Sequence, residues 1–198
     1  MTCALTVKGR QGHVAYPHLA TNPVPALFAM LAPVNSAKLD GGTDYFGPST
    51  AEVTNLKISD PASNVIPDQA FAQFNIRFNT EHTTDSLQGW LEEHFTRVAS
   101  QLEVQYDARF WSNASPFITE ASAHLDVVKA AVEAVTGQSP ELSTTGGTSD
   151  ARFISRLCPV AEFGLVGQTM HQVDEHVSMA DIETLTDIYF EMIRQMDR

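Results

Sequence analysis

The chain has 198 residues, of which 43% are apolar and 18% are charged, a balance that indicates one or two globular domains and excludes a disordered chain. A formal net charge of -12 disfavours nucleic acid and anionic membrane surfaces, so we expect neither as a partner. No apolar run approaches the roughly 20 residues of a membrane-spanning helix.

The chain contains two cysteines, Cys3 and Cys158, which stand far apart in apolar surroundings. Two such cysteines do not make a disulfide framework, so we expect buried thiols in a reducing compartment. Residues 1–10 lack the charged and then apolar build of a signal peptide. These features predict a cytoplasmic location.

The first elements are a strand, a loop and a helix. Apolar and polar residues alternate over residues 2–8, which predicts a strand. A loop rich in Gly, His, Tyr and Pro follows. Asn22 before Pro23 is typical of a helix start, because the asparagine side chain can cap the helix and the proline needs no N–H donor in the first turn. Pro33 should kink or end this helix.

The next four elements complete a recognisable order. Residues 53–58 predict a strand whose uneven spacing indicates a bulge, and residues 70–78 show the most regular alternation in the chain. A helix at 84–98 and a strand at 102–111 follow. The order βαββαβ predicts a ferredoxin-like domain, in which two helices cover one face of a four-stranded antiparallel sheet. We assign this domain to residues 1–112.

Residues 113–198 differ in pattern and predict an αβαβα segment. In chain order the expected elements are a helix at 121–136, a strand near Leu142, a short helix after Asp150, a strand at 158–163 and a helix that starts at Ser178. Two short strands make a thin core, so this segment resembles the edge of a larger α/β sheet. The fold class is therefore α/β, with both units of mixed type.

Two groups in the first domain suit binding or catalysis. The loop GHVAYPH at 12–18 carries His13 and Tyr16, which can donate hydrogen bonds to an oxyanion or a ligand carboxylate, although an ordinary surface loop also fits. Arg77 stands on an otherwise uncharged strand. It can grip a carboxylate through two parallel hydrogen bonds, or it can be one solvated residue of an exposed sheet face.

Two further groups lie in the second unit. The segment GGTSD at 146–150 offers backbone N–H groups to an anion, but it lacks the lysine of a phosphate loop, and a capped turn fits equally well. His171 stands close to Asp174 and Glu175, which suits a metal ligand with supporting carboxylates. A zinc site needs three or four protein ligands, and no second ligand cluster is evident. The spacing of these four groups of residues does not by itself identify a reaction.

Five segments, taken in order, resemble the succinyl-diaminopimelate desuccinylases, a family in the di-zinc M20 group of peptidases and deacylases. The segments are GRQGHVAYPHLATNP, SNVIP, FNIRFNTE, TGGTSDARFI and EFGLVGQTMHQVDEHV. The resemblance runs from about Thr2 to the end of the chain and corresponds to the second half of these enzymes.

The resemblance implies a homodimeric zinc hydrolase that converts N-succinyl-LL-2,6-diaminopimelate to succinate and LL-2,6-diaminopimelate, in lysine and diaminopimelate biosynthesis. It implies that residues 1–112 form a lid and dimerisation domain and that residues 113–198 end a zinc-peptidase-like catalytic domain. The implied partners are a small dicarboxylate amino-acid substrate and a second copy of the chain, bound through the lid.

Individual residues carry implied roles. His171 matches the zinc-ligand histidine, and His13 matches a lid histidine that reaches across the dimer to the scissile carbonyl group and holds the oxyanion. Tyr16 would face the partner's substrate, and Asn64 and Arg77 would approach a substrate carboxylate. Gly147 and Thr148 would line the substrate pocket. The implied substrate-binding positions are Tyr16, Asn64, Arg77, Gly147 and Thr148.

The chain departs from the family in two respects. Gly167 replaces an asparagine that often precedes the zinc histidine by four residues. The other zinc ligands, a bridging aspartate and a glutamate base have no match, so we expect them in a catalytic half that precedes this sequence, and we expect the chain alone to be inactive. The alternatives are a related M20 deacylase such as acetylornithine deacetylase, a peptidase, or a non-catalytic dimerisation module.

Overall fold

The computed structural model describes residues 1–59, 62–144 and 149–197, and the chain forms two compact units, Met1–Pro116 and Phe117–Arg198. The predicted pocket residues Gly147 and Thr148 lie outside the described residues. Among the helices in the described ranges, none is both long and apolar enough to cross a membrane.

The first unit has the predicted βαββαβ order, with two additional short strands. Its strands are β1 (Thr2–Lys8), β2 (Gly12–His13), β3 (Thr50–Ile58), β4 (Val65–Ile66), β5 (Gln69–Arg77) and β6 (Gln105–Trp111). Its helices are η1, a 3-10 turn (Pro17–Leu19), α1 (Pro23–Ser36) and α2 (Thr84–Leu102). The sequence predicted that the last strand begins at Leu102. Instead, α2 continues to Leu102, and β6 begins at Gln105.

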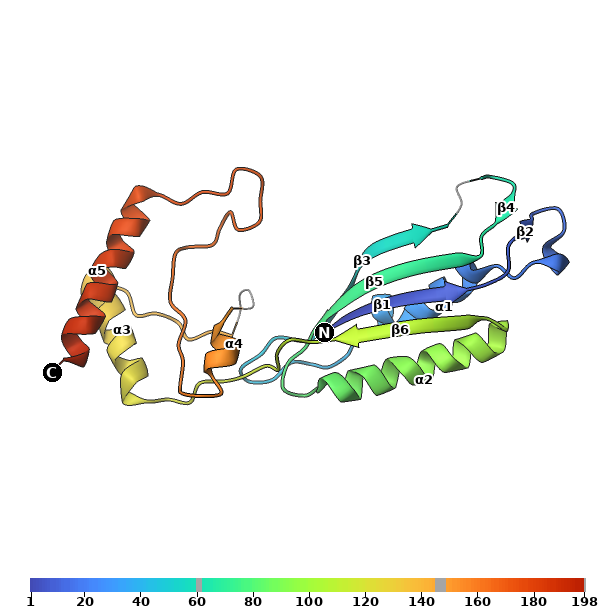
Figure 1. The fold of residues 1–198 in the computed structure, drawn as a ribbon. Coiled ribbons are helices and arrows are strands. Elements are labelled where there is room, and N and C mark those ends of the chain that lie inside the picture. The colour runs from blue at the N-terminus through green and yellow to red at the C-terminus, as the bar shows by residue number, and fades with distance from the viewer. Residues whose placement is uncertain (60–61, 145–148, 198) are drawn as a thin grey trace. The chain divides into compact units, whose positions relative to one another are not determined.

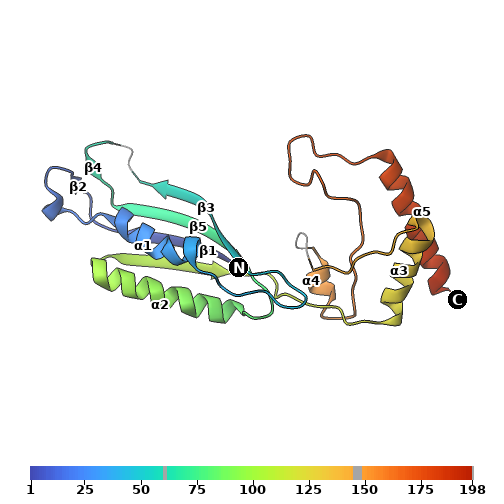
Figure 2. The same cartoon turned by 180° about the vertical axis from the view of Figure 1, so that it is seen from behind.

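The main sheet confirms the ferredoxin-like fold class. Its strand order is β3-β5-β1-β6, every neighbouring pair is antiparallel, and the helices α1 and α2 cover one face (Figures 1 and 2). The register shifts between Val53 and Asn55, where the uneven spacing predicted a bulge. β2 and β4 form a separate two-stranded ladder.

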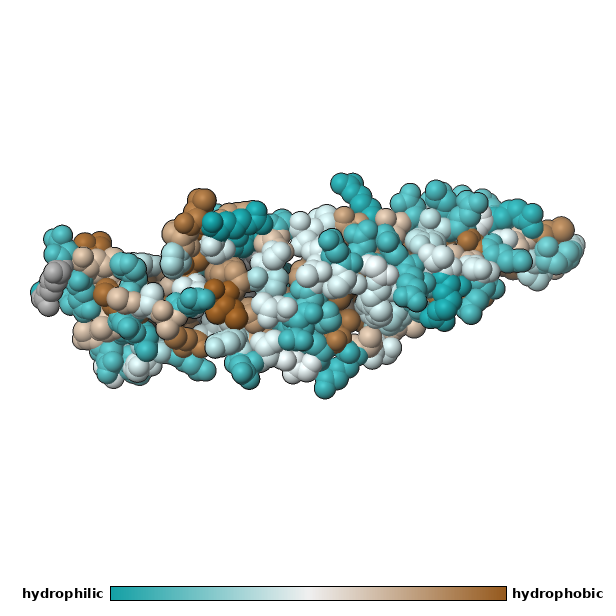
Figure 3. All heavy atoms as spheres, turned by 90° about the horizontal axis from the view of Figure 1, so that it is seen from below, coloured by the Kyte–Doolittle hydropathy of each residue, from teal (hydrophilic) through white to brown (hydrophobic). Residues whose placement is uncertain are grey.

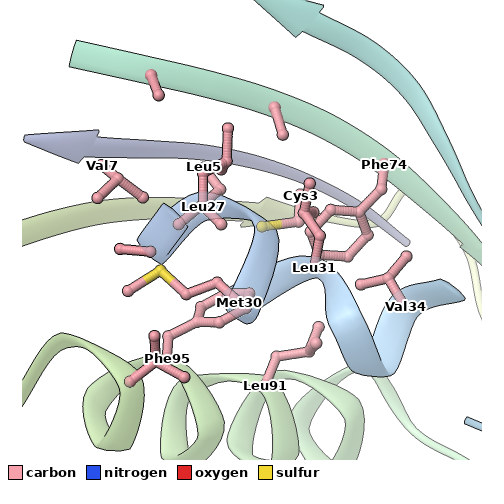
Figure 4. Packing of buried hydrophobic residues seen from close by; sticks show 14 of the residues in the cluster. Cys3, Leu5, Val7, Leu27, Met30, Leu31, Val34, Phe74, Leu91 and Phe95 are labelled. Carbon is pink, nitrogen blue, oxygen red and sulfur yellow. The ribbon is translucent and has the colours of Figure 1, made fainter. Parts of the chain in front are cut away.

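The core of this unit lies between the sheet and the two helices. Figure 4 shows side chains of the alternating positions of β1 facing side chains of α1 and α2. The fully buried members include Cys3, Leu5, Leu27, Met30, Phe74, Leu91 and Phe95. Burial of an apolar side chain of this size stabilises the fold by about 1.5–3 kcal/mol, so this packing holds the sheet against the two helices.

Pro33 does not end α1, which continues to Ser36. In an α-helix the carbonyl of Ala29 would accept the N–H of residue 33, and proline has none. His94 of α2 replaces that donor, because its Nε2 lies 2.9 Å from the Ala29 oxygen. Arg97 donates to Nδ1 of the same ring at 2.7 Å, so both contacts require a neutral imidazole with its proton on Nε2.

A cluster around Asp40 closes the connection between α1 and β3. We call it the Asp40 cluster: the carboxylate accepts N–H bonds from Gly42 and Ser49 and an amide bond from Asn79, and Nε2 of His82 lies 3.1 Å away. The Asp40 side chain is 7% exposed. Burial by itself raises the pKa of Asp40, but the hydrogen bonds from Ser49, Gly42 and Asn79 outweigh it and hold this pKa well below its usual value.

The second unit consists of the helices α3 (Ala123–Thr136), α4 (Ala151–Ile154) and α5 (Met179–Met196). α3 ends at Gly137, which has a φ of 71°, and Ser178 caps α5 by accepting the Asp181 N–H at 3.0 Å, as the sequence predicted. A small apolar cluster between α3 and α5 contains the buried residues Ala131, Val132, Ile188 and Met192.

The two strands predicted for this unit are not formed, since its described residues include no strand. The residues near Leu142 and at 158–163 are irregular. A strand requires a neighbour for its backbone groups. Here side-chain hydroxyl groups, and not a neighbouring strand, donate to two of the backbone carbonyl groups. Thr119 donates to the Val160 carbonyl, and Tyr189 donates to the Phe163 carbonyl at 2.6 Å.

The second unit also leaves much apolar surface exposed, and Figure 3 shows brown apolar atoms on it. On α5, Phe190 is 63% exposed and Ile193 is 67% exposed. Cys158 is exposed, which corrects the prediction that both thiols are buried, whereas Cys3 is buried as predicted. Cys158 is not among the residues of the small cluster between α3 and α5.

Candidate functional site

The ladder of β2 and β4 brings two predicted site residues together. It pairs His13 with Val65, and the N–H of Val14 donates to the carbonyl of Asn64 at 3.1 Å. The first residue of β2, Gly12, has to be a glycine, because a Cβ there would lie 2.7 Å from the Cβ of Ala20. His13 and Asn64 are therefore neighbours although the sequence separates them.

The turn that follows β2 fixes the His13 side chain. The Tyr16 N–H donates to the His13 carbonyl at 2.9 Å, and the Ala15 N–H donates to Nδ1 of the His13 ring at 3.0 Å. The ring centroids of His13 and Tyr16 are 6.0 Å apart, and those of Tyr16 and His18 are 6.4 Å apart. All three rings are exposed, so the predicted donors His13 and Tyr16 form one accessible aromatic group.

Arg77 lies at the opposite end of the main sheet. It is the last residue of β5 and pairs with Thr50, beside the point where Met1 bonds to Ile76. β2 and β4 are at the far end in Figure 1. The length of β5 from Gln69 to Arg77 is about 26 Å at the usual rise of a strand. One copy of the chain therefore groups His13, Tyr16 and Asn64 and separates them from Arg77.

The charge of Arg77 influences its surroundings. Arg77 is exposed, and its side chain belongs to the sheet face opposite the helices, as does Asn75. Burial, with a contribution from the positive charge of Arg77, lowers the pKa of the Met1 amino group. The positive charge of the Arg77 guanidinium is of the sign that suits an anionic group.

His171 stands in an exposed turn of the second unit with a φ of 62°. Glu175 accepts the backbone N–H of His171 at 3.3 Å, and Nδ1 of His176 donates to the Asp174 carbonyl at 2.7 Å. Within the described residues, no group of three or more His, Cys, Asp or Glu side chains is placed to hold a metal ion. The described residues therefore do not fit a complete zinc site, and His171 supplies at most one ligand.

The described end of the GGTSD segment forms a capped turn, one of the two readings that the sequence allowed. Ser149 accepts the Ala151 N–H at 3.0 Å, and Asp150 makes no capping bond from its side chain. Arg152, for which the sequence pattern predicted no role, holds its guanidinium carbon 4.6 Å from the centre of the Phe153 ring. Its Nε is buried and has no hydrogen-bond partner among the described residues.

Comparison with known proteins gives a consistent result along the chain. A family model described as a peptidase dimerisation domain matches residues 1–103. The succinyl-diaminopimelate desuccinylase of Rhodopseudomonas palustris (strain BisB18) is 54% identical over 188 residues, which are 93% of this chain and 47% of that protein. The protein of the same name from Maricaulis maris (strain MCS10) is 48% identical over 194 residues, 98% of this chain and 50% of that protein. The chain thus spans about half the length of the curated relatives it matches.

Solved structures show the same fold at low identity. A tripeptidase from Staphylococcus aureus superposes with a TM-score of 0.80 and 16% identity, over 97% of this chain and 50% of that one. The aminopeptidase PepT from Bacillus cereus superposes with a TM-score of 0.78 and 17% identity, over 100% of this chain and 52% of that one. At these identities the likeness concerns the fold alone.

Proposed function

Because this chain belongs to the family of peptidase dimerisation domains, we propose that it is the lid, dimer-forming and C-terminal half of a succinyl-diaminopimelate desuccinylase. The observation that carries the proposal is the 54% identity to a protein of that name over 93% of the chain. The reaction would hydrolyse the amide of N-succinyl-LL-2,6-diaminopimelate. The C–N bond breaks, the oxygen of water joins the carbonyl carbon, and the amine takes up a proton, which leaves succinate and LL-2,6-diaminopimelate.

His13 is the group of this chain that would act on the reacting atoms. Its exposed ring can donate a hydrogen bond to the carbonyl oxygen, which gains negative charge as water adds. Tyr16 and Asn64 lie beside it and would contact the same substrate. A fixed donor at this position stabilises the transition state more than the uncharged amide.

The separation of Arg77 from His13 supports a site shared between two copies. β5 alone spans about 26 Å between the end of the main sheet next to β2 and β4 and Arg77, whereas the substrate is about 15 Å long when extended. A substrate of this length contacts both side chains more readily when they come from different copies, because within one copy both would have to extend fully toward it. In the proposed dimer, His13 of one copy acts on the substrate whose carboxylate is bound by Arg77 of the other copy, and Asn64 acts with His13.

We propose zinc as the metal of the complete enzyme, with His171 as a ligand and the other ligands supplied from outside the described residues. Zinc would activate the attacking water. Alone, the chain would then be a dimer without hydrolase activity. Its free thiols suit a reducing compartment, and we place the enzyme in the cytoplasm.

A chimera tests the proposal. The part of the Rhodopseudomonas palustris relative that this chain does not cover is joined to residues 1–198, and hydrolysis of N-succinyl-LL-2,6-diaminopimelate is compared with hydrolysis of N-acetylornithine, with the intact relative as control. We expect the succinyl substrate to be preferred. A preference for N-acetylornithine would assign the chain to a different deacylase, and no hydrolysis by a folded, zinc-loaded chimera would support a non-catalytic dimerisation module.

A further inference from the structure

The hydrogen bond behind the His13 ring determines which of its nitrogen atoms carries the proton. The Ala15 N–H points at Nδ1 over 3.0 Å, and the turn that presents it is closed by the bond from the Tyr16 N–H to the His13 carbonyl. A backbone N–H can only donate, so Nδ1 must be the nitrogen without a proton. In the neutral ring the proton is then on Nε2.

We infer that this turn holds His13 as the Nε2–H tautomer, with Ala15 as the positioning residue, so that the neutral ring acts at Nε2 as a hydrogen-bond donor. The inference rests on the proposed function for its catalytic meaning, but the tautomer itself is a property of this chain. A neutral Nε2–H has no lone pair in the ring plane, so it cannot remove a proton from water or bind a metal ion.

The arrangement is the reverse of the one that makes a histidine a general base. A histidine base has an acceptor behind Nδ1, usually a carboxylate or a carbonyl, which holds the proton on Nδ1 and leaves Nε2 free to accept. In the described structure the atom behind Nδ1 of His13 is a donor. The neutral ring therefore already carries its proton on Nε2 before the substrate binds, which suits the stabilisation of an oxyanion.

The ladder of β2 and β4 supports this geometry. His13 is the second residue of β2 and pairs with Val65, while Val14 is bonded to Asn64. The backbone on both sides of the ring is thus held by hydrogen bonds before any substrate binds. His18 provides a comparison within the same loop, because its exposed ring contacts Tyr16 and makes no hydrogen bond to the described part of the chain.

Nitrogen NMR of the 198-residue chain tests the tautomer directly. The histidines are labelled with ¹⁵N, spectra are recorded at pH 8, where neutral rings predominate, and the variants His13→Gln and His18→Gln assign the two rings. We expect His13 to show a single protonated Nε2 and an unprotonated Nδ1. We expect His18 to show the averaged signals of a ring that exchanges between tautomers. A protonated Nδ1 in His13, or the same averaged signals as His18, would overturn the inference.

The chimera provides the catalytic test through two variants of His13. Glutamine places an amide N–H near the position of Nε2, and asparagine places it near Nδ1. We expect His13→Asn to lower kcat by about 10²–10³-fold, the effect of a lost oxyanion donor, and His13→Gln to retain at least about tenfold more activity than His13→Asn, since its donor is in place. Equal losses in the two variants would contradict a donor at Nε2.

Metal analysis separates the donor role from a ligand role, because both variants should keep the zinc content of the parent chimera. Loss of zinc in either variant would show that His13 binds the metal, contrary to the inference. The two proposals also fail differently. If the chimera prefers another amide, the proposed function fails and the NMR result stands. If the NMR result is contrary, the inference fails even when the desuccinylase is active.

Discussion

His94 supports α1 at the position where Pro33 removes a hydrogen-bond donor, and we predict that its replacement destabilises the first unit. Its Nε2 lies 2.9 Å from the Ala29 oxygen, which has no N–H partner four residues on because residue 33 is proline. In His94→Ala this carbonyl loses its donor. A polar group left without a partner costs about 1–3 kcal/mol of unfolding free energy.

Pro33→Ala tests this reasoning, because alanine restores the N–H that the Ala29 carbonyl accepts in an ordinary helix. In the Pro33→Ala background, His94→Ala removes one of two donors and leaves the carbonyl paired. The cost should then fall to the net value of a single hydrogen bond, about 0.5–1.5 kcal/mol. The double-mutant cycle should therefore show a coupling of about 1 kcal/mol between positions 33 and 94.

Urea unfolding followed by tryptophan fluorescence is the appropriate assay, because both tryptophans, Trp90 and Trp111, lie in the first unit. The parent, the two single variants and the double variant are compared at one pH. Arg97→Ala is the matched control, since it lies on the same helix and leaves the bond from His94 to the Ala29 carbonyl intact. If His94→Ala lowers the free energy of unfolding by the same amount in both backgrounds, then His94 does not replace the hydrogen-bond donor that Pro33 lacks.

Three further predictions concern stability and reactivity. The lowered pKa of Asp40 stabilises the fold above the unfolded value of about 3.9, and this contribution is lost as the pH falls below it. Asp40→Asn should therefore flatten the acid limb of the stability curve in urea titrations from pH 6 to pH 3, and an unchanged limb would argue against the Asp40 cluster. Burial, with the charge of a nearby glutamate, raises the pKa of Cys3 to about 12, whereas Cys158 is exposed. A thiol reagent at pH 8 should modify Cys158 first, and mass spectrometry that finds early modification of Cys3 would contradict this. A Cβ at Gly9 would lie 2.1 Å from a backbone carbonyl oxygen, so Gly9→Ala should cost about 1–3 kcal/mol in the same unfolding assay. The control Gly89→Ala, in open space within α2, should stabilise the unit by about 0.5–1 kcal/mol, and equal effects at the two glycines would be inconsistent with the packing.

The elements of the first unit can be predicted from the amino-acid sequence, because their signals are local. Alternation over 70–78 reflects a strand with one buried face, and β5 (Gln69–Arg77) has that burial pattern. Asn22 accepts the N–H of Val24 at 3.0 Å, as expected of a helix cap. The motifs also led to the correct family, since the order of short segments is a property of the chain and needs no coordinates.

The hydrogen bonds between groups that are distant in the sequence depend on the tertiary fold. Nothing around Pro33 indicates that a side chain from α2 replaces its missing donor, and nothing near residue 160 shows that hydroxyl groups take the place of a strand neighbour. The same holds for the candidate site, where one ladder joins His13 to Asn64 and the length of β5 separates both from Arg77. A sequence pattern records which face of an element is apolar, whereas hydrogen-bond partners and distances depend on where the chain places its other segments.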